Sequence, residues 1–422
     1  MILSTFASQN ESKQSMKLND IAEFVTDKIS SSGISLDKYV TTDSLLQNRR
    51  GREIAQNLPP MPCALTHYRQ GDVLVANIRP YLKKVWYADS EGGCSSDVLA
   101  FRAKNGHCPS FLYTVLMQDA FFDYAMSGAK GSKMPRGDKD QIMRYELPTF
   151  TPLEEENIGN MMIDIMSKIN VNRQINDNLE AMAKQLYDYW FVQFDFPNEE
   201  GKPYKSSGGA LVYNEKLKRE IPQGWHCYEL NKWLEIKSGF AFKSETYISK
   251  GKFKVVTIKN VQDHHLDTSS CDYVYEIPQG MKEWCSLSVN DRLISLTGNC
   301  GRLCIVTEND LLLNQRVGLL ACNDEYIDYA YLLLSSEEYQ TLSNNLAKGA
   351  AQANLSPVDL CKNIAVLPKL DVLEKFNRQI KPIVTSYIQN EIQIAELTKQ
   401  RDELLPLLMN GQASVNYHLS DD

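Results

Sequence analysis

Two long stretches of the chain place apolar residues at seven-residue intervals, the spacing of helices that pack side by side. Each stretch has about 35 residues, or roughly 50 Å of helix. One Asn interrupts each stripe at the same level, and a buried Asn in an apolar seam fixes register. We therefore predict an antiparallel coiled coil in which the two asparagines face each other. Its seam residues are Ile158, Ile165, Asn172, Leu179 and Leu186 on the first helix, and Phe376, Ile383, Asn390, Leu397 and Leu404 on the second.

A second apolar column accompanies each stripe. It consists of Met161, Ile175, Met182 and Tyr189 on the first helix, and of Ile380, Tyr387, Ile394 and Leu408 on the second. An alternative is that each stripe covers only its own globular domain, since short apolar stripes are usually core faces. Helices of this length exceed a typical domain helix, which favours a role as spacer and as docking surface for partners.

The chain also repeats itself. Residues 131–190 return recognisably at 351–408, each copy running from a polar loop through a short strand ending in Leu-Pro (Leu147-Pro148, Leu367-Pro368) into a long helix. Upstream, residues 70–75 match residues 289–294, so the repeat includes the globular part. The sequence predicts a tandem of two similar units with an approximate two-fold axis, which suits a bipartite target.

The remaining patterns predict an α+β fold, because short strand-like runs with mixed pairing alternate with helical stretches in both halves. We expect two similar globular domains with mixed β-sheets, separated by the two long helices. The predicted segments are a first domain (1–150), a helix (151–195), a Pro/Gly/Ser-rich linker (196–212), a second domain (213–368), a helix (369–411) and a tail (412–422).

The distribution of charge along the chain says more about possible nucleic-acid binding than the overall composition does. The 422 residues carry a formal net charge of −8, which by itself argues against nucleic-acid binding. However, residues 151–200 hold 3 Lys and Arg against 10 Asp and Glu, so the globular domains are near neutral and retain basic clusters. The polar N-terminus and the absence of a long apolar run make a cytoplasmic protein the expectation, and the ten cysteines fit reduced thiols.

A search for catalytic motifs returns only weak matches. The run Asn57–Met61 lacks the aromatic residue of an amino-methyltransferase loop, and Glu200-Gly201-Lys202 lies in the linker, where we expect no rigid scaffold. The glycine-rich run Gly128–Lys133 fails the phosphate-loop spacing. Neither Cys300 with Cys304 nor the group His264, His265 and Cys271 has the spacing of a zinc site, so we expect no bound metal. The chain is interpreted as a binding subunit without catalysis of its own.

Several basic stretches combine positive charge with side chains that can read base edges. Arg can bind guanine in two places and Asn or Gln can do so with adenine, whereas Lys mainly neutralises phosphate. The simpler alternative for each residue is a solvated surface charge. The candidates are Arg49, Arg50, Arg52, Arg79, Lys83, Lys84, Lys130, Lys133 and Arg136 in the first domain, and Lys243, Lys254, Lys259, Asn260, Asn314, Gln315 and Arg316 in the second.

The ordered set of motifs resembles the DNA specificity subunits of type I restriction-modification systems. The resemblance covers nearly the whole chain: two domains alternating with two helices, the strand starts Gly71–Leu74 and Asn290–Leu293, the Leu-Pro helix starts, and the junction from Trp190 through Gly209 to Ile221–Trp225. It implies that each domain is a target-recognition domain for one half of a split double-stranded DNA sequence, and that the helices fix the gap.

The resemblance also implies partners that carry the chemistry. Methyltransferase subunits, two of them by expectation, and restriction-translocase subunits would assemble around the chain and bind S-adenosylmethionine, ATP and Mg²⁺, with no cofactor on this chain. Two other interpretations stay open from the residues alone: a nuclease or DNA methyltransferase with an unrecognised active site, and a coiled-coil interaction protein without nucleic-acid function.

Overall fold

The computed structural model describes residues 2–5, 15–347 and 353–416. The chain forms two compact units. Unit 1 comprises residues 1–171 together with 395–422, and unit 2 comprises residues 172–394. Among the residues described, no helix is long and apolar enough to cross a membrane.

Unit 1 contains two four-stranded sheets. The first has the order β3-β10-β7-β8 and the second the order β4-β6-β9-β5. The strands are β3 (Ala22–Phe24), β10 (Val98–Ala103), β7 (Val73–Ala76), β8 (Val85–Tyr87), β4 (Lys28–Ser30), β6 (Ala64–Tyr68), β9 (Gly92–Cys94) and β5 (Tyr39–Val40). Helices α1 (Leu18–Ile21), α2 (Pro109–Leu116), α3 (Asp119–Ser127) and α4 (Lys139–Ile142) complete the domain. Strand β11 (Glu146–Pro148) pairs with β2 (Ser15–Lys17), and β1 (Ile2–Thr5) pairs with β24 (Ala413–Asn416).

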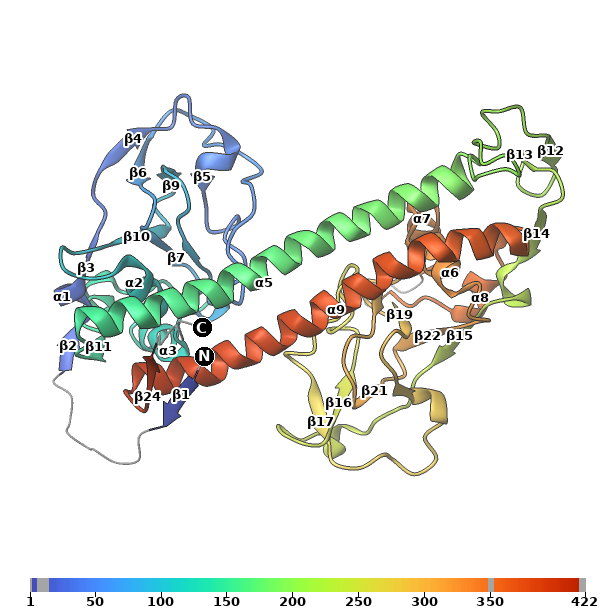
Figure 1. Ribbon diagram of the computed structural model, residues 1–422. Coiled ribbons are helices and arrows are strands. Elements are labelled where there is room, and N and C mark those ends of the chain that lie inside the picture. Colours follow the sequence, from blue (N-terminus) through green and yellow to red (C-terminus); the bar gives the residue numbers. More distant parts are fainter. Residues whose placement is uncertain (1, 6–14, 348–352, 417–422) are drawn as a thin grey trace, which may run out of the picture. The chain divides into compact units, whose positions relative to one another are not determined.

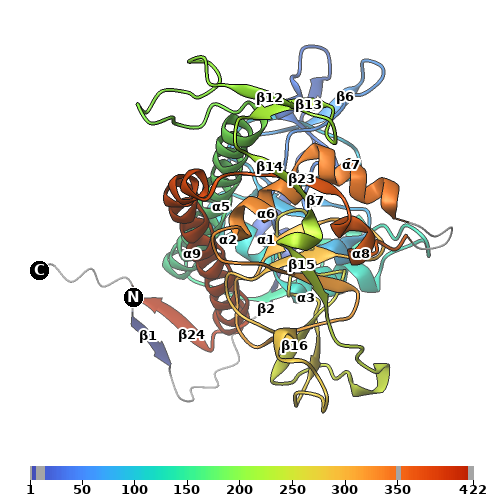
Figure 2. The same ribbon diagram turned by 90° about the vertical axis from the view of Figure 1, so that its right-hand side faces the viewer.

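Unit 2 repeats this plan. Its sheets have the orders β15-β22-β19-β20 and β17-β16-β21-β18. The strands are β15 (Glu235–Ser238), β22 (Val317–Ala321), β19 (Arg292–Ser295), β20 (Leu303–Ile305), β17 (Asp272–Val274), β16 (Phe253–Val256), β21 (Leu311–Leu313) and β18 (Ser286–Leu287). Helices α6 (Ile327–Ser335), α7 (Glu337–Leu346) and α8 (Pro357–Cys361) follow. Strand β23 (Ile364–Leu367) pairs with β14 (His226–Glu229), and β12 (Leu211–Asn214) pairs with β13 (Arg219–Pro222) (Figure 2).

The repeat predicted from sequence is confirmed at the level of strand pairing. The first sheet has the same strand order in both units, and in the second sheet a parallel pair (β5 with β9, β16 with β21) is flanked by an antiparallel strand (β6, β18). The difference lies at the sheet edge. In unit 1 the fourth strand, β4, pairs with β6, whereas in unit 2 the fourth strand, β17, pairs with β16. The predicted α+β class with mixed sheets is therefore confirmed.

The predicted linker, residues 196–212, lies within unit 2 and is ordered. Phe196 is buried and its ring lies 4.9 Å from that of Trp225 and 4.6 Å from that of Tyr204. The backbone of Asn198 accepts a hydrogen bond from Gly201, and Pro197 forms a β-bridge with Pro203. The expectation that this Pro/Gly/Ser-rich stretch lacks a rigid scaffold is therefore wrong, because aromatic packing holds it to the second domain.

Two long helices, α5 (Pro152–Tyr187) and α9 (Leu370–Met409), each contribute to both units. A π-helical turn, Asp188–Val192, continues α5. In unit 1 Arg401 contacts the sulfur of Met166, whereas in unit 2 Asn176 bonds Glu391. As residue numbers rise along α5 they fall along α9, so the helices are antiparallel, as predicted (Figure 1).

The seam of α5 differs in one column from the prediction. Met161 of that column is buried as predicted, but Ile175, Met182 and Tyr189 are exposed to 40%, 51% and 39% of their surface. The inner positions one residue further along are buried instead: Met162, Ile169, Asn176, Ala183 and Trp190. The sequence favoured the wrong column because that inner column contains Asn176 and the small Ala183. The other predicted column lies inward, with Ile158, Asn172 and Phe376 buried and Ile165, Leu179, Leu186, Ile383, Asn390, Leu397 and Leu404 half-buried.

The polar residues of the seam form a layer within unit 2. Asn172 donates to Gln393 at 2.7 Å, and Asn176 donates to the Glu391 carboxylate at 2.7 Å. Asn390 in turn donates to Asn176 at 3.0 Å. The expected pairing of Asn172 with Asn390 is therefore wrong, because each bonds a neighbour of its predicted partner. We call these five residues the polar layer.

Replacing the central member of this layer should destabilise unit 2. Asn176→Leu removes donors from buried Glu391 and the acceptor used by Asn390, and stranding such groups costs about 2–4 kcal/mol. We expect the melting temperature to fall by roughly 5–10 °C in a thermal-shift assay. Asn178→Leu, an exposed position on the same helix, is the matched control and should not lower it. Equal melting temperatures for wild type and Asn176→Leu would contradict the role of the layer.

Candidate nucleic-acid interface

Three loops meet beside the first sheet of unit 1. The chain leaves β7 through residues 77–79, and the backbone N–H of Asn77 donates to the carbonyl of Asp97 at 2.9 Å. The N–H of Gly137 donates to the carbonyl of Asn77 at 3.2 Å, and that of Arg79 to the carbonyl of Pro135 at 2.8 Å. We call residues 77–79, 95–97 and 134–137 loop junction 1. Because backbone hydrogen bonds hold the three loops together, the residue types at these positions can differ without loss of the junction.

The same junction exists in unit 2. Leu296 N–H donates to the Arg316 carbonyl at 2.9 Å, and Gly298 N–H to the Ala353 carbonyl at 2.9 Å. Residues 296–299, 314–316 and 353–354 form loop junction 2. The bridge between Ile78 and Arg136 in unit 1 corresponds to the bridge between Thr297 and Asn354 here. The backbone hydrogen bonds of the junction therefore repeat in both units, whereas the side chains at the bridged positions differ.

The fold also brings together the three basic stretches of the first domain. Asn48 N–H donates to the Leu82 carbonyl at 3.0 Å and Arg49 N–H to the Lys83 carbonyl at 2.9 Å, which joins the first stretch to the second. Loop junction 1 then joins the second stretch to residues 130–136, where Lys130 and Arg136 exchange backbone bonds. Stretches that lie far apart in sequence thus form one continuous surface segment.

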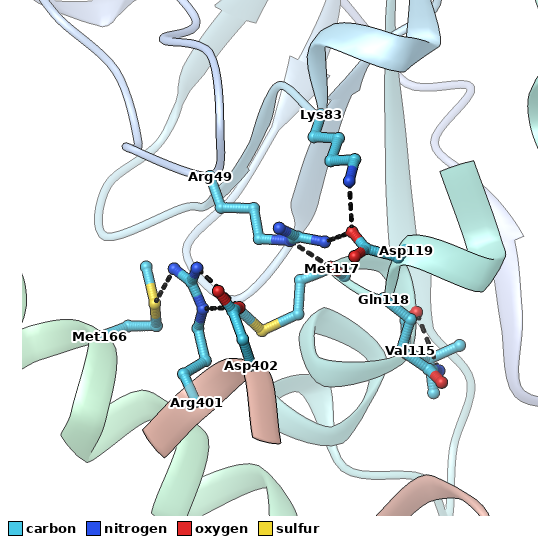
Figure 3. A network of polar contacts seen from close by, with 9 residues as sticks. All are labelled: Arg49, Lys83, Val115, Met117, Gln118, Asp119, Met166, Arg401 and Asp402. Carbon is cyan, nitrogen blue, oxygen red and sulfur yellow. Dashed lines mark hydrogen bonds and ion pairs between the residues drawn. The ribbon is translucent and has the colours of Figure 1, made fainter. Parts of the chain in front are cut away.

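Two candidates on this segment are structural. Arg49 is only 6% exposed; its guanidinium donates to the Met117 carbonyl and forms an ion pair with Asp119, which Lys83 also binds at 2.6 Å (Figure 3). Burial of Asp119 opposes its charge, but the bonds from Lys83 and Arg49 prevail and lower its pKa. Lys84 is buried and donates to the Thr42 carbonyl at 2.6 Å, and burial lowers its pKa. Arg49 and Lys84 are therefore removed from the candidate DNA contacts.

The other candidates of unit 1 reach the surface to different degrees. Arg52 lies 4.4 Å from the Trp86 ring and donates to the Asp37 carbonyl. Exposed Lys130 and Arg136 form ion pairs at 3.1 Å with Asp138 and Asp97. Arg79 is half-buried in the left-handed region, with φ 53°. Arg50 and Lys133 are exposed and, within the described part of the chain, have no side-chain partner.

In unit 2, two of the predicted amides hold loops rather than face solvent. Asn260 is fully buried, accepting from Thr257 N–H at 2.8 Å and donating to the Asp267 carbonyl at 2.8 Å. Asn314 is 9% exposed and accepts from Arg316 N–H at 3.2 Å. Both are therefore removed from the candidates.

Lys254 is half-buried and paired with Glu308 at 2.6 Å, so most of its charge is already matched. Exposed candidates are Lys243, Lys259, Gln315 and Arg316.

Sequence reasoning missed the polar members of the junctions that carry little charge. Thr297 donates its hydroxyl to the Asn354 side chain at 2.9 Å, and Asp97 pairs with Arg136. Alignment of the two repeats was the available signal, since it sets residues 95–97 opposite residues 314–316. The comparison places Asp97 where unit 2 has Arg316, so opposite charges occupy equivalent positions.

Comparison with known proteins identifies related chains. Residues 222–403 match the family described as type I restriction modification DNA specificity domain. The MjaIX specificity subunit of Methanocaldococcus jannaschii is 26% identical over 365 residues, covering 84% of this chain and 80% of the relative. The HindI specificity subunit of Haemophilus influenzae is 21% identical, covering 94% and 98%. The crystal structure of a type I system S subunit from M. genitalium shares the fold, with TM-score 0.59, 14% identity and coverage of 96% and 98%.

Adjacent arginines allow a direct test of which charges are structural. Arg49→Ala should lower stability by about 1–3 kcal/mol, because it removes a buried guanidinium and its hydrogen bond to the Met117 carbonyl, while Asp119 keeps Lys83 as a partner. Arg50→Ala should change stability by no more than about 0.5 kcal/mol, as expected for an exposed residue. Thermal denaturation of the two purified variants checks this. Similar melting temperatures would show that Arg49 does not hold the loop.

Proposed function

We propose that this chain, which is similar to type I restriction-modification DNA specificity subunits, reads a bipartite double-stranded DNA target, one block with each loop junction. The observation that carries this proposal is the repetition of one backbone scaffold with different side chains. Junction 1 presents Asp97 and Arg136, whereas junction 2 presents Gln315, Arg316 and Asn354. A fixed frame with variable polar groups suits the reading of two different short sequences.

The side chains of the junctions suit base readout. Arg316 and Gln315 are exposed neighbours held by the buried Asn314, and guanidinium and amide groups can make paired bonds to guanine and adenine in the major groove. Exposed Arg50, Lys133, Lys243 and Lys259 would neutralise phosphates and position the duplex. Both long helices contribute to both units, and we expect them to set the gap between the blocks.

We further propose that catalysis belongs to partner subunits. The exposed face of α5 in unit 2 carries Ile175, Met182, Tyr189 and Val192, each 39–51% exposed. An apolar stripe of this kind on a long helix fits a docking surface, here for methyltransferase subunits, of which we expect two. These subunits would bind S-adenosylmethionine, and restriction-translocase subunits would use ATP and Mg²⁺. This chain would hold none of these cofactors.

The readout proposal predicts a change in one block only. The double variant Gln315→Ala and Arg316→Ala should relax discrimination in one block by about 1–3 kcal/mol per base contact and leave the other unchanged. Lys259→Ala should weaken binding of all duplexes and reduce the salt dependence. Mapping methylated sites in cells that express each variant with its partners measures the first effect. Gln223→Ala, an exposed amide outside the junction, is the control. Unchanged methylation in the double variant would contradict the assignment.

The docking proposal predicts a charge-sensitive helix face. Met182→Glu places a carboxylate in the apolar stripe and should weaken association with the purified methyltransferase subunit at least tenfold, because the charge must be desolvated. Gln185→Glu adds the same charge at an exposed position nearby and should have little effect. Analytical ultracentrifugation of the mixtures gives both affinities. Equal weakening by both variants would indicate a general charge effect and not a docking stripe.

A further inference from the structure

Unit 2 contains a cavity of about 680 Å³ that DNA reading does not use and that shares Val192 with the proposed docking stripe. It lies among α5, α6, β23 and α9, and its volume falls in the range of small-molecule sites. Its wall is rich in aromatic side chains. Five buried tyrosines, Tyr187, Tyr329, Tyr331, Tyr339 and Tyr387, line it together with Phe191.

The charges along the cavity wall are mostly paired. Lys184 binds Asp188 at 3.2 Å, and Arg219 lies 4.0 Å from Glu338. Asp328 is held at 2.6 Å by buried Arg292. The charge of each of these groups is balanced within the protein and does not require a charged ligand.

Glu180 differs from these groups. It lines the cavity from α5, and no Lys, Arg or His of the described chain forms an ion pair with it. Burial, followed by the nearby carboxylates of Asp177 and Glu391, raises its pKa to about 8. A shielded carboxylate without a cationic partner is costly, and such groups concentrate at functional sites.

A second polar group in the wall also lacks a partner. Tyr187 is only 5% exposed, yet its hydroxyl forms no hydrogen bond with any residue that the structure describes. Three of the other cavity tyrosines donate to carbonyls: Tyr329 to Val366, Tyr339 to Ile364 and Tyr387 to His264. Because Tyr187 lines the cavity, its unbonded hydroxyl is available to a ligand there.

The two groups lie on one face of the same helix. Glu180 and Tyr187 are seven residues apart, or about 10.5 Å along the axis at 1.5 Å per residue. Between them stand aromatic surfaces, with the rings of Phe191 and Tyr329 4.8 Å apart and those of Tyr187 and Tyr329 6.0 Å apart. Aromatic faces attract cations as well as apolar groups.

We propose that this cavity binds an organic amine with an aromatic body, whose ammonium group pairs with Glu180 and whose polar far end bonds the Tyr187 hydroxyl. Charge complementarity selects the cation, because the half-buried Glu180 carboxylate, which has a hydrogen bond with the Tyr387 side chain, forms no ion pair with a cationic residue of the described wall. The aromatic wall selects a flat apolar body, and the placement of Glu180 and Tyr187 about two helical turns apart selects a ligand that is polar at both ends. The site is independent of DNA recognition.

Three probes of matched shape test the proposal on the purified full chain. Tyramine has both polar ends, phenethylamine lacks the hydroxyl, and 2-phenylethanol replaces the ammonium by a neutral group. At pH 8.5, where the Glu180 carboxyl is largely ionised and the amines remain charged, isothermal titration calorimetry should give one saturable site for tyramine. Phenethylamine should bind severalfold more weakly, and 2-phenylethanol at least tenfold more weakly.

Two substitutions assign the contacts. Glu180→Gln should lower tyramine affinity at least tenfold without loss of the folded state, which thermal melting verifies. Tyr187→Phe should remove the preference for tyramine over phenethylamine while phenethylamine binds as before. Glu374→Gln removes an exposed carboxylate of α9 outside the cavity and should change nothing.

Absence of saturable tyramine binding would overturn the proposal, and so would equal affinity for 2-phenylethanol or wild-type affinity in Glu180→Gln. Since no DNA or partner enters the titration, the result does not depend on the proposed reading function.

Discussion

One aromatic cluster ties the long helices to the second globular domain. Phe191 at the end of α5 lies 4.8 Å from Phe376 of α9 and 4.8 Å from Tyr329 of α6, measured between ring centres. Trp190 and Trp225 join the same buried core. Neither helix nor sheet can bury these rings alone, so the helix pair and the domain of unit 2 share one core. The direction of the helices within that unit is therefore coupled to the placement of loop junction 2.

This coupling continues beyond the cluster through polar contacts. Tyr387 of α9 donates to the carbonyl of His264 at 2.7 Å, and His265 lies 3.1 Å from Glu391. Burial opposes the charge of Glu391, but the bonds from His265 and Asn176 lower its pKa. The polar layer thus serves two purposes in unit 2: it sets the register of α5 and α9, and it holds the loop at residues 262–266 against the helices.

The two units separate what is constant from what varies. Strand order, backbone bonds at the junctions and the Leu-Pro helix starts recur, because each is needed to close the same core. The side chains at the junctions differ and even reverse in charge, as with Asp97 and Arg316, because the backbone already holds the loops. Such a division allows the polar side chains of a junction to change without loss of the fold.

The sequence by itself determined the tandem repeat, the α+β class and the antiparallel helix pair, because periodic apolar positions and repeated motifs are local properties. It also determined that seam asparagines would matter. Only the tertiary structure decided which column of α5 faces inward, since exposed Met182 is more apolar in sequence than its buried neighbour Ala183. Likewise, only the fold could distinguish Arg49 from Arg50, or buried Asn314 from exposed Gln315, because burial depends on segments distant in sequence. The cavity itself could not be predicted: Leu179, Ile383 and Tyr387 belong to the predicted seam columns, but the residues from other segments join them only in the folded unit.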